Sequence, residues 1–102
     1  MGSTISNQIT IHKLRYTLPI ISIGELCKTY PNNIYVLLGD IAIDATEFVE
    51  FHPGGKSAIL NRHMCDITRD YEFHSANGKH KILAYARWII VIIFSILICH
   101  IE

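Results

Sequence analysis

The stretch from Phe51 to Gly55 constrains this chain most, because it combines a helix stop, a tight turn and a potential metal ligand. Pro53 lacks a backbone N–H and its ring clashes with the preceding turn, so a helix must end before it. Gly54 and Gly55 allow a sharp turn and a close approach of the backbone to a bulky group. The imidazole of His52, which can bind a metal ion, therefore stands at the edge of a turn.

A second histidine, His74, follows in Tyr71-Glu72-Phe73-His74-Ser75, again beside aromatic residues. Two histidines on separate turns can hold a flat apolar cofactor from both faces. If His52 and His74 filled both axial positions of a haem iron, no open position would remain for oxygen or peroxide, which favours electron transfer. Each imidazole then needs its other ring nitrogen oriented, usually by a backbone carbonyl.

Alternatives stay open on these residues alone. The His-Pro-Gly-Gly sequence can be only a helix stop and turn. His63 competes with His74 as a second ligand. A zinc site built from His52, His63, His74 and Cys65 is also conceivable, although the spacing fits no usual zinc pattern.

The order of local signals predicts an α+β domain with a small mixed sheet and pairs of short helices. Residues 1–15 read as a flexible polar lead. The predicted elements are a short edge strand at 16–18, a helix at 23–29 capped by Ser22, a hairpin at 34–44, a helix ending at His52, helices at 56–64 and 66–71, and a last helix that begins after Ser75.

Composition argues against several classes of function. Nine Lys and Arg balance nine Asp and Glu, which argues against nucleic acid as a partner, since phosphate binding needs a basic surface. The three cysteines form no C-x-x-C pair, so a reducing compartment fits better than a disulfide framework. The absence of C-x-x-C-H from the sequence excludes covalent c-type haem attachment.

The C-terminal part is uncharged from Trp88 to Cys99 and predicts a helix buried in protein or lipid. Counted from Ile82 to Ile101, twenty residues would reach across a bilayer. We therefore expect residues 84–102 to be a single-pass membrane anchor. The basic residues just upstream, Lys79, Lys81 and Arg87, favour a cytosolic N-terminal domain.

From about Tyr16 to Leu83 the sequence closely resembles cytochrome b5. The residues that carry the resemblance are Tyr16-Thr17-Leu18, Asp44-Ala45-Thr46-Glu47-Phe48, His52-Pro53-Gly54-Gly55, Asp66-Ile67-Thr68 and His74-Ser75. The resemblance implies a haem-binding domain at 16–83 with paired short helices around the haem pocket. Two departures are the interval between the histidines, about two residues shorter than usual, and Phe73, where glycine is common in the family.

The resemblance implies a non-covalent b-type haem with His52 and His74 as axial iron ligands. It also implies that the haem pocket is lined by Phe48, Val49, Ile59 and Tyr71, with Leu37 and Leu83 as weaker candidates. Ser75 matches the serine that helps to hold a haem propionate.

The implied function is one-electron transfer at a membrane surface. Electrons would come from a flavin-dependent cytochrome b5 reductase and pass to membrane-bound oxidases, desaturases or hydroxylases, with the endoplasmic reticulum as the expected membrane. The sequence contains no flavin or nicotinamide motif, so we expect a carrier rather than an enzyme. The alternatives are a non-redox haem- or lipid-binding adaptor on the same fold and an enzyme with an open haem site.

Overall fold

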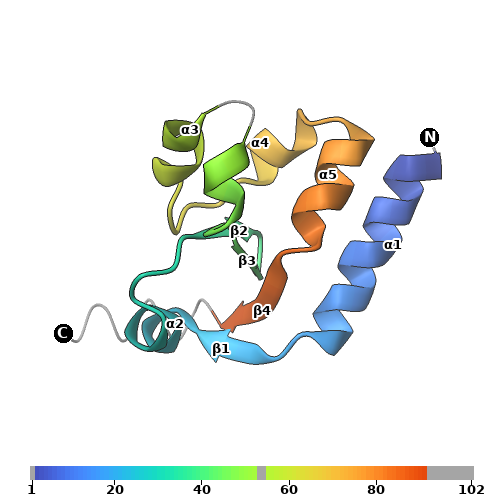
Figure 1. Ribbon diagram of the computed structural model, residues 1–102. Coiled ribbons are helices and arrows are strands. Elements are labelled where there is room, and N and C mark those ends of the chain that lie inside the picture. Colours follow the sequence, from blue (N-terminus) through green and yellow to red (C-terminus); the bar gives the residue numbers. More distant parts are fainter. Residues whose placement is uncertain (1, 53–54, 92–102) are drawn as a thin grey trace.

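A four-stranded mixed sheet forms the centre of the computed structural model, which describes residues 2–52 and 55–91 (Figure 1). Its strands are β1 (Ile20–Ser22), β2 (Tyr35–Leu38), β3 (Ile41–Asp44) and β4 (Ala86–Val91). The spatial order is β1-β4-β3-β2. The edge strand β1 runs parallel to β4, whereas the β4–β3 and β3–β2 pairs are antiparallel.

Helices pack around the sheet, so the predicted α+β class is confirmed. The helices are α1 (Gly2–Thr17), α2 (Ile23–Thr29), the 3-10 helix η1 (Phe48–Phe51), α3 (Lys56–Leu60), α4 (Thr68–Glu72) and α5 (Ala76–Leu83). Figure 1 shows α3, α4 and α5 gathered above the sheet, with α2 at its lower end and α1 running beside α5.

The predicted hairpin is confirmed and separates two apolar cores. Gly39, with φ at 61°, makes the turn between β2 and β3. Val36 and Leu38 of β2 point into the larger core beneath α3, α4 and α5, while Tyr35 and Leu37 point into a smaller core that includes Leu26 of α2. This alternation follows from the two-residue period of a strand.

Strand β4 corrects the prediction of one continuous C-terminal helix. Residues Ala86–Val91 were expected in that helix, but they pair with both β1 and β3. The β-branched run Ile89-Ile90-Val91 suits a central strand, where the sheet supplies backbone partners and burial on both faces. The span counted from Ile82 therefore does not exist as a helix. No helix in residues 2–52 and 55–91 is long and apolar enough to cross a membrane; residues 92–102 lie outside the described part.

The structure of the N-terminal segment differs from two predictions, a flexible lead at 1–15 and an edge strand at 16–18. It forms the helix α1, and the edge strand begins only at Ile20. Ile11 and Leu14 of α1, with Leu18 just after it, pack against the larger core. Asn7 is buried and its side-chain amide donates a 3.1 Å hydrogen bond to the carbonyl of Ala76 in α5. The apolar residues lie three to four positions apart, which is the spacing of one helix face.

The predicted helix caps are confirmed where Ser22 and Ser75 begin α2 and α5. The Ser22 hydroxyl accepts from the N–H of Glu25 at 3.1 Å, and the Ser75 hydroxyl accepts from the N–H of Gly78 at 3.1 Å. The Glu25 carboxylate accepts a hydrogen bond from Thr29 instead of completing the capping box. The helix predicted at 56–64 is shorter than expected and ends at Leu60.

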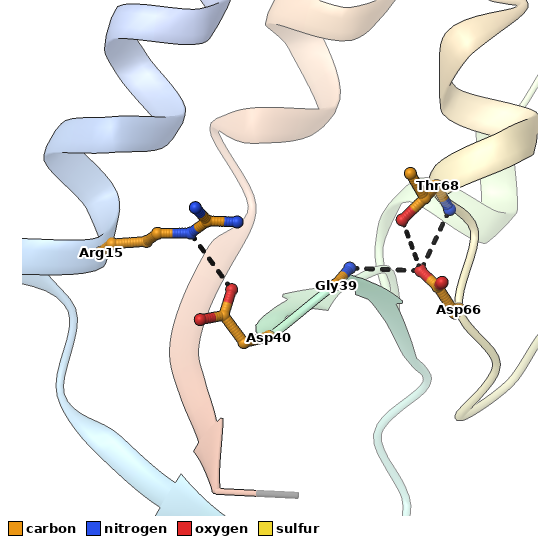
Figure 2. A network of polar contacts seen from close by, with 5 residues as sticks. All are labelled: Arg15, Gly39, Asp40, Asp66 and Thr68. Carbon is orange, nitrogen blue, oxygen red and sulfur yellow. Dashed lines mark hydrogen bonds and ion pairs between the residues drawn. The ribbon is translucent and has the colours of Figure 1, made fainter.

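Asp66 joins the sheet to the start of α4 (Figure 2). One carboxylate oxygen accepts hydrogen bonds from the N–H of Gly39 at 3.2 Å and from the N–H and hydroxyl of Thr68 at 3.1 and 2.6 Å. These hydrogen bonds lower the pKa of Asp66 because they favour its ionised form, and the bond from the Thr68 hydroxyl has the largest effect. On the far side of the same turn Arg15 of α1 forms an exposed ion pair with Asp40 at 3.2 Å.

We predict that Asp66→Ala lowers the free energy of unfolding by about 1 kcal/mol at pH 7, as loss of a capping carboxylate does. A lowered folded-state pKa means that this contribution is present above the unfolded-state pKa and is lost as pH falls through the folded value. The deficit of the variant should therefore shrink below about pH 4. Urea unfolding of the unaltered protein and of Asp66→Ala between about pH 7 and pH 2 measures this deficit.

The matched control is Asp40→Ala, which removes the carboxylate of the residue that follows Gly39 in the β2–β3 turn. Its ion pair is exposed on both sides, so we expect a cost of at most about 0.5 kcal/mol. A deficit of Asp66→Ala that stays constant down to pH 2 would contradict the role given to the Asp66 carboxylate.

Candidate functional site

A cavity of about 1080 Å³ opens between η1 and α3 on one side and α4 and α5 on the other. Both histidines singled out by the sequence line it. The remaining lining residues are Val36, Ala45, Phe48, Ala58, Ile59, Asn61, Arg62, Ile67, Asp70, Tyr71, Ser75, Asn77, Gly78, Lys79, Lys81 and Ile82. This volume suits a large cofactor or ligand.

His52 is joined to Gly55 by two hydrogen bonds. It follows η1 in an extended conformation, and its Nδ1 lies 3.2 Å from the carbonyl oxygen of Gly55. In return the N–H of Gly55 donates to the carbonyl of His52 at 3.0 Å. Gly55 has φ at 93°, a conformation that side-chain-bearing residues rarely adopt. Glycine at this position therefore brings the carbonyl to the imidazole.

His74 is oriented by the last turn of α4. Its Nδ1 lies 2.8 Å from the carbonyl oxygen of Asp70, and its backbone N–H donates to the carbonyl of Tyr71 at 3.1 Å. Phe73, the C-cap of α4, is 82% exposed and has ordinary helical backbone angles. The position before His74 therefore needs no glycine, because the Phe73 side chain points into solvent.

The two hydrogen bonds fix the chemistry of both rings. A carbonyl oxygen can only accept, so Nδ1 of His52 and Nδ1 of His74 each carry the proton. The Nε2 atom of each neutral ring then keeps its lone pair for a metal. The expectation that a backbone carbonyl orients each ring is confirmed.

Two Asp-x-Thr turns set where the histidine-bearing segments begin. Thr46 donates its N–H and hydroxyl to the Asp44 carboxylate at 3.0 and 2.6 Å, and Thr68 does the same to Asp66 at 3.1 and 2.6 Å. These are local side-chain turns that compete with helix and strand. The middle residues of the turns, Ala45 and Ile67, are buried in the cavity wall.

Four of the predicted pocket residues, Phe48, Ile59, Tyr71 and Ser75, line the cavity. Val49 of η1 does not; it is buried in the larger apolar core. The weaker candidates also lie elsewhere. Leu83 is in the same core, and Leu37 points to the opposite face of the sheet.

His63 belongs to a different site from His52 and His74. Its Nδ1 accepts the N–H of Tyr35 at 3.2 Å, and it lines a separate pocket of about 110 Å³ beside α2. Within residues 2–52 and 55–91, no three His, Cys, Asp or Glu side chains come together as a metal site. The zinc alternative is therefore wrong.

Sequence reasoning missed several wall residues. Val36 could have been found from its alternation with Leu37 in the hairpin, since only one face of a strand meets a given core. Lys79 and Ile82 of α5 follow the predicted cap Ser75 at helical spacing, which places them on the same face as Ser75. Nothing in the sequence indicated that Arg62 lines the cavity as well.

Tyr71 adds a polar group to an otherwise apolar part of the wall. Its side chain is buried, and its hydroxyl has no hydrogen-bond partner among the described residues. Burial, and secondarily the charge of Glu72, raises the pKa of Tyr71. The ammonium of Lys79 lies 5.4 Å from the centroid of the Tyr71 ring. An unpaired buried hydroxyl costs stability.

Comparison with known proteins agrees with this geometry. Residues 25–89, more than half of the 102-residue chain, match the cytochrome b5-like haem/steroid binding domain family. The chain belongs to the cytochrome b5-like family. Cytochrome b5 of Cuscuta reflexa is 30% identical over 63 residues, which cover 59% of this chain and 47% of that protein. The match thus spans about half the length of this relative.

The extent of the cytochrome b5-like match bears on two elements. It ends at residue 89, inside β4, so most of this strand lies within the family domain. It begins at residue 25, inside α2, which leaves α1 and β1 outside the matched region. The helix α1, which contacts α5, therefore lies outside the matched residues.

We predict that Tyr71→Phe leaves the free energy of unfolding of the ligand-free protein unchanged or raises it by about 1 kcal/mol, because it removes an unpaired buried hydroxyl while keeping the ring. Urea unfolding of the ligand-free protein measures the change. A loss of 1 kcal/mol or more would show that the hydroxyl has a partner.

Proposed function

We propose that this protein is a one-electron carrier that holds a haem between His52 and His74. The observation that carries the proposal is the pair of imidazoles lining one cavity, each with Nδ1 held by a backbone carbonyl and Nε2 left for iron. The family supports haem as the ligand. A steroid or other lipid would need no such pair of oriented imidazoles.

The residues present fit a haem. The cavity offers two nitrogen ligands and a wall of apolar side chains such as Phe48, Ile59 and Ile67, which keep water away from a ring system. Bound haem supplies an iron that changes by one charge. If His52 and His74 both held the iron, no place would remain on it for a substrate, which would favour electron transfer over catalysis.

A non-covalent, b-type haem is the form we propose. Covalent attachment needs cysteines beside the macrocycle, and neither Cys27 nor Cys65 lines the cavity. The sequence also has no C-x-x-C-H. The protein's hold on the haem would therefore consist of iron ligation, apolar contact and polar contacts at the edge, including Ser75.

The partners remain proposals from the family resemblance. The donor would be a flavin-dependent reductase, and the acceptors would be membrane-bound oxidases, desaturases or hydroxylases. Membrane attachment, with the endoplasmic reticulum as the expected membrane, now depends on the apolar sequence after Val91, because the residues before it belong to the sheet.

We predict that His52→Ala and His74→Ala each abolish the low-spin spectrum of the haem-loaded protein, since each removes one axial ligand. Absorption spectra of the oxidised and reduced forms measure it. Potentiometric titration of the unaltered protein should show a reversible one-electron step.

The control is His63→Ala, because His63 faces another pocket. It should keep the low-spin spectrum. A low-spin spectrum that survives His74→Ala but disappears in His63→Ala would contradict the ligand assignment. Failure of the unaltered protein to bind haem, together with binding of a sterol, would instead favour the lipid-binding adaptor.

A further inference from the structure

Charge is unevenly distributed around the cavity. The wall formed by β2, η1 and α3 presents apolar side chains, among them Val36, Phe48 and Ile59. The wall formed by α5 and its N-cap presents mainly polar and basic ones, namely Ser75, Asn77, Lys79 and Lys81, beside the apolar Ile82. The cavity is therefore amphipathic and would favour one orientation of a ligand that has an apolar and an anionic edge.

The two α5 lysines account for the excess positive charge of the lining. The other charged lining residues are Arg62 and Asp70, which form an ion pair with each other at 3.5 Å. Glu72, which pairs with Lys79, does not line the cavity. Among the described residues of the lining, no carboxylate therefore neutralises the two positive charges on α5.

Lys79 is poorly neutralised by the protein. Its side chain is only 13% exposed, and its ammonium lies 3.7 Å from the carboxylate of Glu72, which is itself 65% exposed. This distance is too long for a strong charged hydrogen bond, which needs about 2.7–2.9 Å. A largely buried ammonium is costly unless it is closely paired. Lys79 therefore has room for a second anionic partner on the cavity side.

Lys81 lies two residues further along α5 and is exposed. Within the part of the chain that the structure describes, it forms no ion pair with any carboxylate. Lysine carries its charge on a flexible stem and reaches anions as a point charge. The Lys81 ammonium can therefore meet an anionic group at the mouth of the cavity.

We propose that Lys79 and Lys81 form an anion subsite that binds the two carboxylates of a porphyrin dicarboxylate and so sets its orientation. This inference rests on the proposed function. The carboxylate edge of the ligand would lie along α5 and the apolar edge toward η1 and α3. The two positive charges match the two carboxylates, so the cavity rim loses its excess charge when the ligand binds.

The subsite also tunes the bound iron. Positive charge near an iron favours its reduced state, because reduction adds an electron. Neutralising either lysine should therefore lower the reduction potential. A lysine that only supported the fold of α5 would have no such effect.

The test compares iron protoporphyrin IX with its dimethyl ester, which has the same ring and iron but no carboxylates. Binding of each probe is measured by absorbance titration for the unaltered protein, Lys79→Met, Lys81→Met and the double variant. Methionine keeps the apolar stem of lysine. We expect each single change to weaken binding of the dicarboxylate by about 3–10-fold, as loss of about 0.7–1.4 kcal/mol of ion pairing does, and to change binding of the ester less than about 2-fold.

Lys56→Met is the matched control. Lys56 does not line the cavity, and its ammonium lies 2.8 Å from the carboxylate of Glu50. It should leave the affinity for both probes and the reduction potential unchanged. Equal weakening of acid and ester by the α5 variants would overturn the subsite, because the lysines would then act only through the fold.

The same titrations distinguish failure of iron ligation from failure of the anion subsite. If the unaltered protein fails to give a low-spin iron complex with either probe, iron ligation by His52 and His74 is wrong. The subsite is then judged by fluorescence titration with metal-free protoporphyrin IX. Its binding must still weaken in Lys79→Met and Lys81→Met, and binding that is absent or insensitive to both changes would overturn the subsite as well.

Discussion

Two hydrogen bonds from imidazole Nδ1 atoms to backbone carbonyls are the contacts on which this site depends. They fix the tautomer of His52 and His74 and leave both Nε2 atoms free. Each bond requires a particular backbone. The first needs the positive φ of Gly55, and the second needs α4 to end at Glu72, two residues before His74. Gly55, the last residue of the His-Pro-Gly-Gly sequence, thus helps to orient the imidazole of His52.

Hydrogen bonds from other parts of the domain support these two turns. Both are preceded by an Asp-x-Thr turn, and Asp66 also hydrogen-bonds the β2–β3 turn through Gly39 (Figure 2). In the sheet beneath, β4 lies between β1 and β3 and pairs with both. On the other side of the site, Asn7 connects α1 to the first turn of α5, next to His74 and Ser75. The segments that carry His52 and His74 are therefore supported from the sheet and from α1.

Local signals predicted those parts of the fold that local physics determines. Ser22 and Ser75 cap helices, Gly39 turns the hairpin, and both histidines reach one cavity. The run Ile89-Ile90-Val91 could not be assigned from the sequence, because an apolar β-branched segment suits a lipid-facing helix and a central strand equally well until its partners are known. α1 was missed because its apolar face is sparse and Asn7, a polar residue, occupies a buried position. The direction of the α5 lysines depends on where the helix docks, which no local pattern specifies.

The central claim is that the protein itself supplies both axial ligands of a haem iron. The most direct measurement is the absorption spectrum of the haem-loaded, unaltered protein in its oxidised and dithionite-reduced forms, before and after addition of carbon monoxide. With both imidazoles on the iron, the spectra should be low-spin in both oxidation states, and carbon monoxide should leave the reduced spectrum unchanged. A high-spin oxidised spectrum, or rapid conversion of the reduced form by carbon monoxide, would show an open iron position and contradict the account.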